Sequence, residues 1–200
     1  APTFNDMYGP AGWGSNPDLN PERSRNGEAS LHYKSKGQAI DVVYFDSRVN
    51  DLIAADNTWT LQNLSAVRIN GIEISYAGQF GDTGVNAALT KQKPRNVQTG
   101  GTLLRRADIF SSMGVTRQFG EWKLGGEWQY SGTREDFDIN TFARTTLPSY
   151  SIVNGTASYA ISKQLKLSLR IDNLLNKDYM LAHGYNTLGR TLFVGFNYQQ

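Results

Sequence analysis

Residues 165–200 of the chain read LKLSLRIDNLLNKDYMLAHGYNTLGRTLFVGFNYQQ. Leucine or isoleucine occupies every second position of residues 165–171, and a second alternating run covers residues 192–198. A period of two places neighbouring side chains on opposite faces of a β-strand, so both runs predict strands with one apolar face. The polar connection between them, residues 173–190, is far longer than the roughly two to five residues of an ordinary hairpin loop. Such a pair is typical of the closing hairpin of an outer-membrane β-barrel.

The same alternation recurs upstream, and its clearest example places Trp122, Leu124, Trp128 and Tyr130 on one face of a strand. Aromatic side chains on an apolar face suit the girdles that barrels carry at the two bilayer interfaces, although a soluble sheet also packs aromatic residues into its core. The predicted strands are residues 27–33, 40–49, 72–76, 85–89, 109–115, 122–130, 153–159, 165–171 and 192–198. The faces of residues 41–45 stay unassigned.

Short and long connections alternate along these nine strands. Short turns are predicted at 35–37, 81–84, 118–120 and 162–164, and long polar loops at 46–65, 91–103, 134–149 and 173–190. Outer-membrane barrels have short periplasmic turns and long extracellular loops, so nine crossings that start from an extracellular loop end at a periplasmic C-terminus. Residues 1–23, rich in Gly and Pro, are predicted to be that loop, and residues 24–200 to be the strands with their connections. Complete bacterial barrels have an even number of strands, so nine predict one part of a larger barrel.

Composition excludes several other classes. Twenty basic and 18 acidic residues give a formal net charge of +2, too balanced for a nucleic-acid-binding protein. No segment approaches the roughly 18 to 20 apolar residues of a transmembrane helix. The chain has no Cys, and its start at Ala1 shows no signal peptide.

Four phrases resemble TonB-dependent outer-membrane transporters, most of all their vitamin B12 (cobalamin) branch. They are APTFNDMY at residues 1–8, NPDLNPERS at 16–24, IDNLLNKDY at 171–179 and GYNTLGR at 184–190. The resemblance covers essentially the whole chain. It implies the C-terminal nine or so strands of a 22-stranded antiparallel transmembrane β-barrel, without the plug domain. It also implies energy-coupled uptake of cobalamin or a related corrinoid across the outer membrane of a Gram-negative bacterium, with the inner-membrane protein TonB and outer-membrane lipid as partners.

The resemblance also implies a substrate contact. The phrase LLRRA at residues 103–107 matches one in the cobalamin branch whose first arginine contacts the substrate, and this arginine corresponds to Arg105. Arg106 is its candidate companion. Paired arginines at a barrel rim can instead bind lipopolysaccharide phosphates or loop carboxylates. A second family contact, a tyrosine, corresponds to Ile139, and this departure leaves room for another corrinoid or for a ferric siderophore.

Other chemistry finds little support. Asp136 and Asp138 could be an acid and base pair or calcium ligands, but we expect them to be solvated loop residues. His32 and His183 are too few and too distant in sequence to predict a metal site. The competing interpretations are an outer-membrane barrel enzyme, such as a protease or phospholipase, and a soluble carbohydrate-binding sandwich. No motif supports a Ser-His-Asp order, so no catalytic residue, cofactor or metal is predicted and the protein is expected not to be an enzyme.

Overall fold

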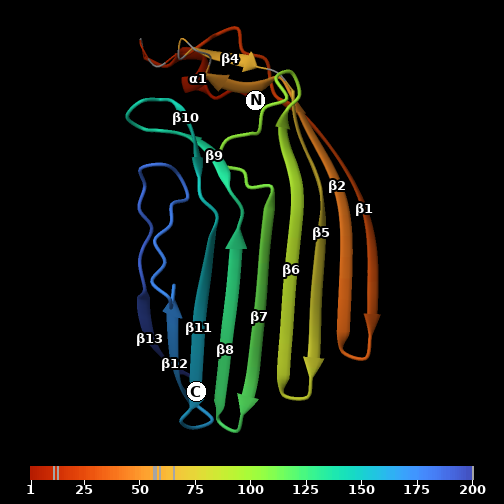
Figure 1. Ribbon diagram of the computed structural model, residues 1–200, viewed down its shortest axis with the longest axis vertical. Helices are drawn as coiled ribbons and strands as arrows, with labels where there is room; N and C mark the ends of the chain where they lie inside the picture. The colour runs from red at the N-terminus through yellow and green to blue at the C-terminus, as the bar shows by residue number, and fades with distance from the viewer. Residues whose placement is uncertain (11, 13, 56–57, 59, 65, 200) are drawn as a thin grey trace. The chain divides into compact units, whose positions relative to one another are not determined.

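The computed structural model describes residues 1–200 except 11, 13, 56–57, 59, 65 and 200. Nine strands form one sheet in the order β1-β2-β5-β6-β7-β8-β11-β12-β13, and the pairs whose register is resolved are antiparallel. The strands are β1 (Arg23–Ser35), β2 (Gln38–Asn50), β5 (Val67–Phe80), β6 (Thr83–Asn96), β7 (Ile109–Phe119), β8 (Trp122–Ser131), β11 (Tyr150–Ala160), β12 (Leu165–Asp172) and β13 (Thr191–Tyr198). The predicted antiparallel all-β fold and its nine strands are confirmed (Figure 1).

Four tight turns join strand pairs, as the sequence predicts. Gly37, Gly81 and Gly120 have φ of 78°, 58° and 56° there, in the left-handed region that glycine enters without steric cost.

The predicted loops hold more structure than expected. The segment predicted as a loop at 46–65 contains the end of β2 and a hairpin of β3 (Leu52–Ala55) and β4 (Leu61–Leu64), and the segment at 134–149 contains β9 (Arg134–Phe137) and β10 (Arg144–Leu147). β6 continues through the first residues of the loop predicted at 91–103. Residues 1–23 contain helix α1 (Phe4–Tyr8), whose Thr3 and Asp6 form a capping box, and Arg23 already belongs to β1. The loop interpretation was wrong at β3, β4, β9 and β10 because strands of four residues leave little periodicity to read, and it also missed α1 and the ends of β1, β2 and β6.

The strand register separates an apolar face from a polar face. Leu124 is opposite Arg117 on β7 and Ala157 on β11, and Leu169 is opposite Val194. Side chains of β8, β12 and β13 that the sequence places on one apolar face do share a face: Trp122, Leu124, Trp128, Tyr130, Leu165, Leu167, Leu169, Val194 and Phe196. Many of them are exposed, with Phe196 at 73%. Exposed apolar surface on this scale marks a face that meets another apolar phase.

The chain divides into two compact units. Unit 1 comprises residues 1–29, 44–71 and 92–103, and unit 2 comprises residues 30–43, 72–91 and 104–200. In unit 2 the buried side chains gather where the long connections meet the strands; they are Ala107, Ser131, Arg134, Asp136, Leu147, Ile152 and Asn173. Four of these seven side chains are polar or charged, an unusual share for a core, so this region is the candidate functional site. Among the described residues, no helix is both long enough and apolar enough to cross a membrane.

Candidate functional site

Arg105 lies in the connection from β6 to β7, within unit 2, and its backbone has an unusual conformation. Its φ of 57° is in the left-handed region, where few residues other than glycine are found. The Arg105 N–H donates to the Glu135 carbonyl at 2.7 Å, which ties this turn to β9. The Arg105 side chain is 57% exposed. The backbone is thus fixed while the guanidinium group can reach solvent.

Asp136 orients this guanidinium. Its Oδ1 accepts from Arg105 Nε at 3.0 Å and from the Phe137 N–H at 2.9 Å, and its Oδ2 accepts from the His183 N–H at 2.8 Å. The Asp136 side chain is 0% exposed. Burial by itself raises the pKa of this carboxyl, but the N–H groups of His183 and Phe137 and the guanidinium of Arg105 together bring the pKa below its ordinary value. Asp136 is therefore an anion that joins three separate segments of the chain.

Arg134 lies on β9 together with Asp136 and also binds the 173–190 connection. Its Nη2 donates to the Met180 carbonyl at 2.8 Å, and its guanidinium carbon lies 4.9 Å from the centre of the Tyr150 ring. Tyr150 in turn packs against Tyr179, with ring centres 4.5 Å apart. Arg134 is 6% exposed, and its Nε has no hydrogen-bond partner among the described residues. β9 therefore carries two buried charged groups, Arg134 and Asp136, that hold residues 180–183.

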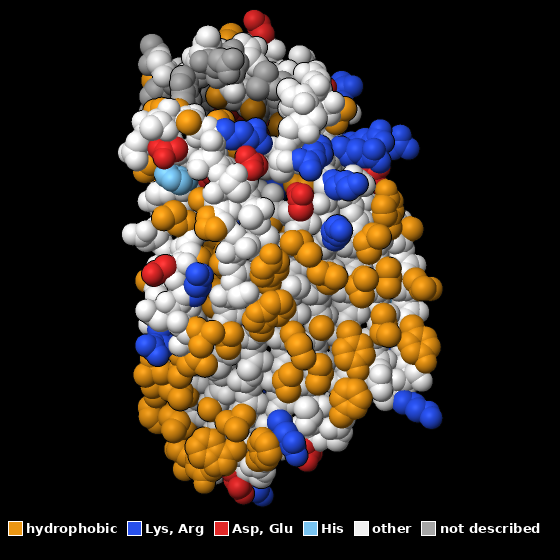
Figure 2. Space-filling model, in the orientation of Figure 1, with side chains coloured by type: hydrophobic (Ala, Val, Ile, Leu, Met, Phe, Trp, Pro, Cys, Tyr) orange, Lys and Arg blue, Asp and Glu red, His pale blue; other side chains and the backbone are white. Residues whose placement is uncertain are grey.

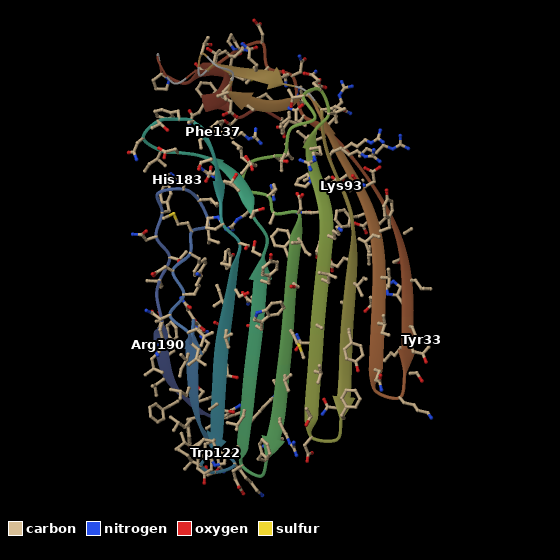
Figure 3. All side chains as sticks on the ribbon, in the orientation of Figure 1. Tyr33, Lys93, Trp122, Phe137, His183 and Arg190 are labelled. Carbon is tan, nitrogen blue, oxygen red and sulfur yellow. The ribbon has the colours of Figure 1, made fainter. Side chains whose placement is uncertain are left out.

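His183 and Asp138 form the outer edge of this arrangement. The His183 Nδ1 accepts from the Ile139 N–H at 3.3 Å, and its Nε2 lies 3.6 Å from Asp138 Oδ2. The N–H groups of Thr141 and Asn140 donate to Asp138 and lower its pKa. Figure 3 shows His183 close to the β9–β10 hairpin that carries Phe137.

Ile139 also contacts the 173–190 connection. A Cβ atom added at Gly184 would lie 2.5 Å from Ile139 Cδ1, and Gly184 has a φ of 79°. The isoleucine thus fills the place beside this glycine. It is 48% exposed and presents an apolar surface beside this connection.

Arg106 is not part of the cluster. It is exposed, and no hydrogen bond or ion pair joins it to a described residue. The two predicted site residues therefore differ, since Arg105 is oriented by a buried carboxylate and Arg106 is not.

A hollow opens on the polar face of the sheet beside the 173–190 connection. It measures about 590 Å³, and Glu127, Asn154, Asn173, Tyr179 and Leu188 are among its lining residues. Asn173 spans this connection by donating to the Lys177 carbonyl at 2.9 Å and accepting from the Lys177 N–H at 2.8 Å. The hollow thus offers an aromatic ring and amide groups to a polar ligand, and Arg105 is not among its lining residues.

The prediction that Asp136 is a solvated loop residue was wrong, because the loops from 104–108 and 173–190 close over it. Sequence reasoning also missed Arg134, Tyr150 and Tyr179 as parts of this cluster. The partial signal was the alternation of Arg134 and Asp136 on a four-residue strand, which places both side chains on one face.

His32 joins a second polar group on the sheet. Its Nδ1 contacts Asp41 Oδ1 and its Nε2 lies 3.0 Å from Ser30 Oγ, while Ser75 Oγ donates to Asp41 Oδ2 at 3.4 Å. No sequence motif predicts this grouping of Ser30, His32 and Asp41. The carboxylate of a hydrolase triad is buried, whereas the Asp41 side chain is 41% exposed, so we interpret the group as a network of the polar face. No group of three or more His, Cys, Asp or Glu side chains in the described part of the chain could hold a metal ion.

Comparisons with known proteins agree with this fold. A family model described as TonB dependent receptor-like, beta-barrel matches residues 1–174. The vitamin B12 transporter BtuB of Vibrio cholerae is 32% identical over 206 residues, which cover 100% of this chain and 33% of that protein. BtuB of Photobacterium profundum is 31% identical over 211 residues, with the same coverage. The chain thus spans about a third of the length of these relatives.

Solved structures share the fold at low identity. The copper transporter OprC superposes with a TM-score of 0.78 at 19% identity, covering 98% of this chain and 35% of that one. The ferric-catecholate import receptor Fiu from K12 E. coli superposes with a TM-score of 0.76 at 19% identity. The match covers 94% of this chain and 29% of the Fiu chain.

Proposed function

This chain belongs to the family of TonB-dependent receptors, and on that premise we propose that it is part of an outer-membrane receptor that takes up cobalamin or a related corrinoid. The polar face of the sheet then lines the lumen, and the apolar face meets lipid. The short turns and the C-terminus lie in the periplasm, and the long connections, with residues 1–23, lie outside the cell. Uptake is driven through TonB in the inner membrane.

The observation that carries this proposal is the position of Arg105. Its Nε donates to the buried Asp136, and no described residue accepts a hydrogen bond from its terminal amino groups. A corrinoid presents amides and a phosphate, which are the acceptors that a fixed guanidinium binds best. Arg106, exposed on the same turn, is proposed as a weaker, unoriented second donor.

The test uses the full-length receptor purified in detergent. Calorimetric titration with cyanocobalamin should give saturable binding, and expression of the receptor in a strain that lacks its own cobalamin receptor should restore uptake that depends on TonB. Absence of cyanocobalamin binding by folded receptor would reject the proposal.

One observation favours a second candidate, a ferric-siderophore receptor. Ile139, 48% exposed, stands where the cobalamin branch has a tyrosine contact, so the ligand meets an apolar group there. Titration of the same sample with ferric catecholate and hydroxamate siderophores distinguishes the two cargoes.

A further inference from the structure

The hollow on the polar face of the sheet is built by β8, β11, β12 and β13 together with the 173–190 connection. Its lining residues on the strands include Glu127, Gln129, Asn154 and Asp172. Each of them alternates along its strand with side chains of the apolar face. Figure 2 shows the hydrophobic side chains that cover much of the strands, and the hollow lies on the opposite face. The whole hollow belongs to unit 2.

The lining has hydrogen-bonding groups that the protein itself does not use. Gln129 is half-buried, and its side-chain amide makes no hydrogen bond with a described residue. Glu127 Oε2 accepts from Asn154 Nδ2 at 3.3 Å, whereas Glu127 Oε1 accepts from none of the described residues. Arg170 Nε lies 3.2 Å from Asp172 Oδ1, and the terminal amino groups of this arginine have no acceptor in the described part of the chain. The hollow thus presents both donors and acceptors to a ligand.

Aromatic rings give the same hollow an apolar part. Tyr179 comes from the 173–190 connection, and Phe193 on β13 adds a second ring that is 43% exposed. The guanidinium carbon of Arg170 lies 4.3 Å from the centre of the Phe193 ring. Apolar surface with a few unpaired polar groups is typical of a small-molecule site. A corrinoid is matched to it, because its hydrocarbon macrocycle carries amide groups at the edge.

Further hollows follow on the polar face toward the short turns. A second one, of about 240 Å³, shares Glu127 and Asn154 with the first and reaches Thr116 and Thr156. A third one, of about 390 Å³, shares Thr116 and Thr156 with the second and reaches Lys123 near the start of β8. Because neighbouring hollows share lining residues, the three lie end to end. We call them the groove; it runs from the 173–190 connection toward the turn between β7 and β8.

The 173–190 connection borders both the groove and the cluster around Arg105. The His183 N–H donates to Asp136, and Asp136 accepts from Arg105. Tyr179 and Leu188 of the same connection line the first hollow of the groove. A ligand that leaves Arg105 along the polar face therefore meets this hollow next.

We propose that the groove is the path of the corrinoid along the barrel wall and that its first hollow is a transit subsite. The inference rests on the proposed function, in which the polar face lines the lumen and the short turns lie in the periplasm. A ligand seated in the hollow gives up water on that side, so its amides need partners on the protein. Gln129 and Glu127 supply these partners, and Tyr179 and Phe193 contact the hydrocarbon part. Loss of Gln129 therefore slows transport and leaves the first binding step at Arg105 unchanged.

The experiment measures uptake of radiolabelled cyanocobalamin by the full-length receptor in a strain that lacks its own cobalamin receptor. The test variant is Gln129→Leu, which removes the amide and nearly keeps the side-chain volume. The matched control is Gln199→Leu, since Gln199 is an exposed glutamine beyond the end of β13. The maximal uptake rate per folded receptor should fall about twofold to tenfold in Gln129→Leu, the effect of one lost hydrogen bond, and stay unchanged in the control. Glu127→Leu is a second test variant with the same expected effect.

Calorimetric titration of the purified receptors with cyanocobalamin separates this inference from the proposed function. Slower uptake by Gln129→Leu at unchanged affinity supports the transit subsite. Equal uptake by both test variants and the unaltered receptor would overturn it. An affinity that falls as much as the uptake rate would overturn it as well, because the hollow would then belong to the first binding site. No binding by the folded unaltered receptor would reject the cargo itself, and this path with it.

Discussion

Arg105 and Asp136 show how one residue pair can serve both folding and binding. The carboxylate is 0% exposed and the arginine is 57% exposed, so the pair reaches from the core to the solvent. A charge removed from water needs several hydrogen bonds to offset its desolvation, and Asp136 accepts three. One of these three hydrogen bonds comes from Arg105 Nε, so the same bond that stabilises the carboxylate also orients the guanidinium.

We expect Arg105→Ala in the full-length receptor to weaken cobalamin binding without reducing the amount of folded barrel. A charged hydrogen bond contributes roughly 1.5 to 3 kcal/mol, so the affinity should fall about tenfold to a hundredfold. Calorimetric titration measures the change, and Arg117→Ala, an exposed arginine at the far end of β7, is the matched control. An unchanged affinity for Arg105→Ala would remove the contact from the proposal.

Asp136→Asn should release residues 180–184 and the orientation of Arg105 together. The folded-state pKa of Asp136 lies below its unfolded value, so its contribution to stability is complete above the unfolded pKa and is lost as pH falls through the folded pKa. Amide exchange of residues 180–184 in the unaltered receptor should therefore stay slow at neutral pH and rise only in strong acid. In the Asp136→Asn receptor, amide exchange of residues 180–184 should be fast at neutral pH and in strong acid alike. Asp82→Asn, at the short turn between β5 and β6, is the control. Equal exchange in the Asp136→Asn and unaltered receptors would mean that Asp136 does not hold residues 180–184.

At the scale of elements, the β9–β10 hairpin organises the site, although it has only four residues in each strand. Its pairing runs from Arg134 opposite Leu147 to Phe137 opposite Arg144. This short ladder holds Arg134 and Asp136 two residues apart on one face, toward the 173–190 connection. The hairpin is thus the support on which that connection folds.

Arg134→Ala should loosen the 173–190 connection while leaving the nine-stranded sheet intact. The change removes the hydrogen bond to the Met180 carbonyl and the cation contact with Tyr150, each about 1 kcal/mol. Limited proteolysis should cut residues 180–188 roughly tenfold faster or more. The control is Arg144→Ala on the opposite strand, whose side chain is 47% exposed. Equal cleavage of both variants would mean that Arg134 does not hold the connection.

At the scale of the whole molecule, the sheet has one apolar and one polar face and two outer strands, β1 and β13. Spin labels at Trp122, Leu124, Trp128, Tyr130, Leu165, Leu167, Leu169, Val194 and Phe196 should be protected from aqueous relaxers and exposed to oxygen when the receptor is in lipid. Labels at Glu127 and Asn154 on the polar face are the comparison. Reversed accessibility would mean that the apolar face is a soluble core.

The 200-residue chain taken alone should not remain a monomer. Its outer strands present unpaired amide and carbonyl groups beside an apolar face, which favours pairing with another chain. Light scattering in detergent should show association, and amide exchange should slow in β1 and β13 as concentration rises. A monomer with slow exchange at both strands would show that these edges are satisfied within the chain.

The sequence by itself determined the nine strands of the large sheet, their tight turns and, except at residues 41–45, the two faces of the sheet. These follow from a period of two, which any strand with one lipid-facing side must keep, as the row from Trp122 to Tyr130 does. It also predicted Arg105 through a family phrase. Tertiary structure alone decided that Asp136 is buried, that Arg134 and Tyr150 belong to the site, and that Arg106 does not join it. Those properties arise where loops distant in sequence meet, and an irregular backbone carries no period that records its neighbours.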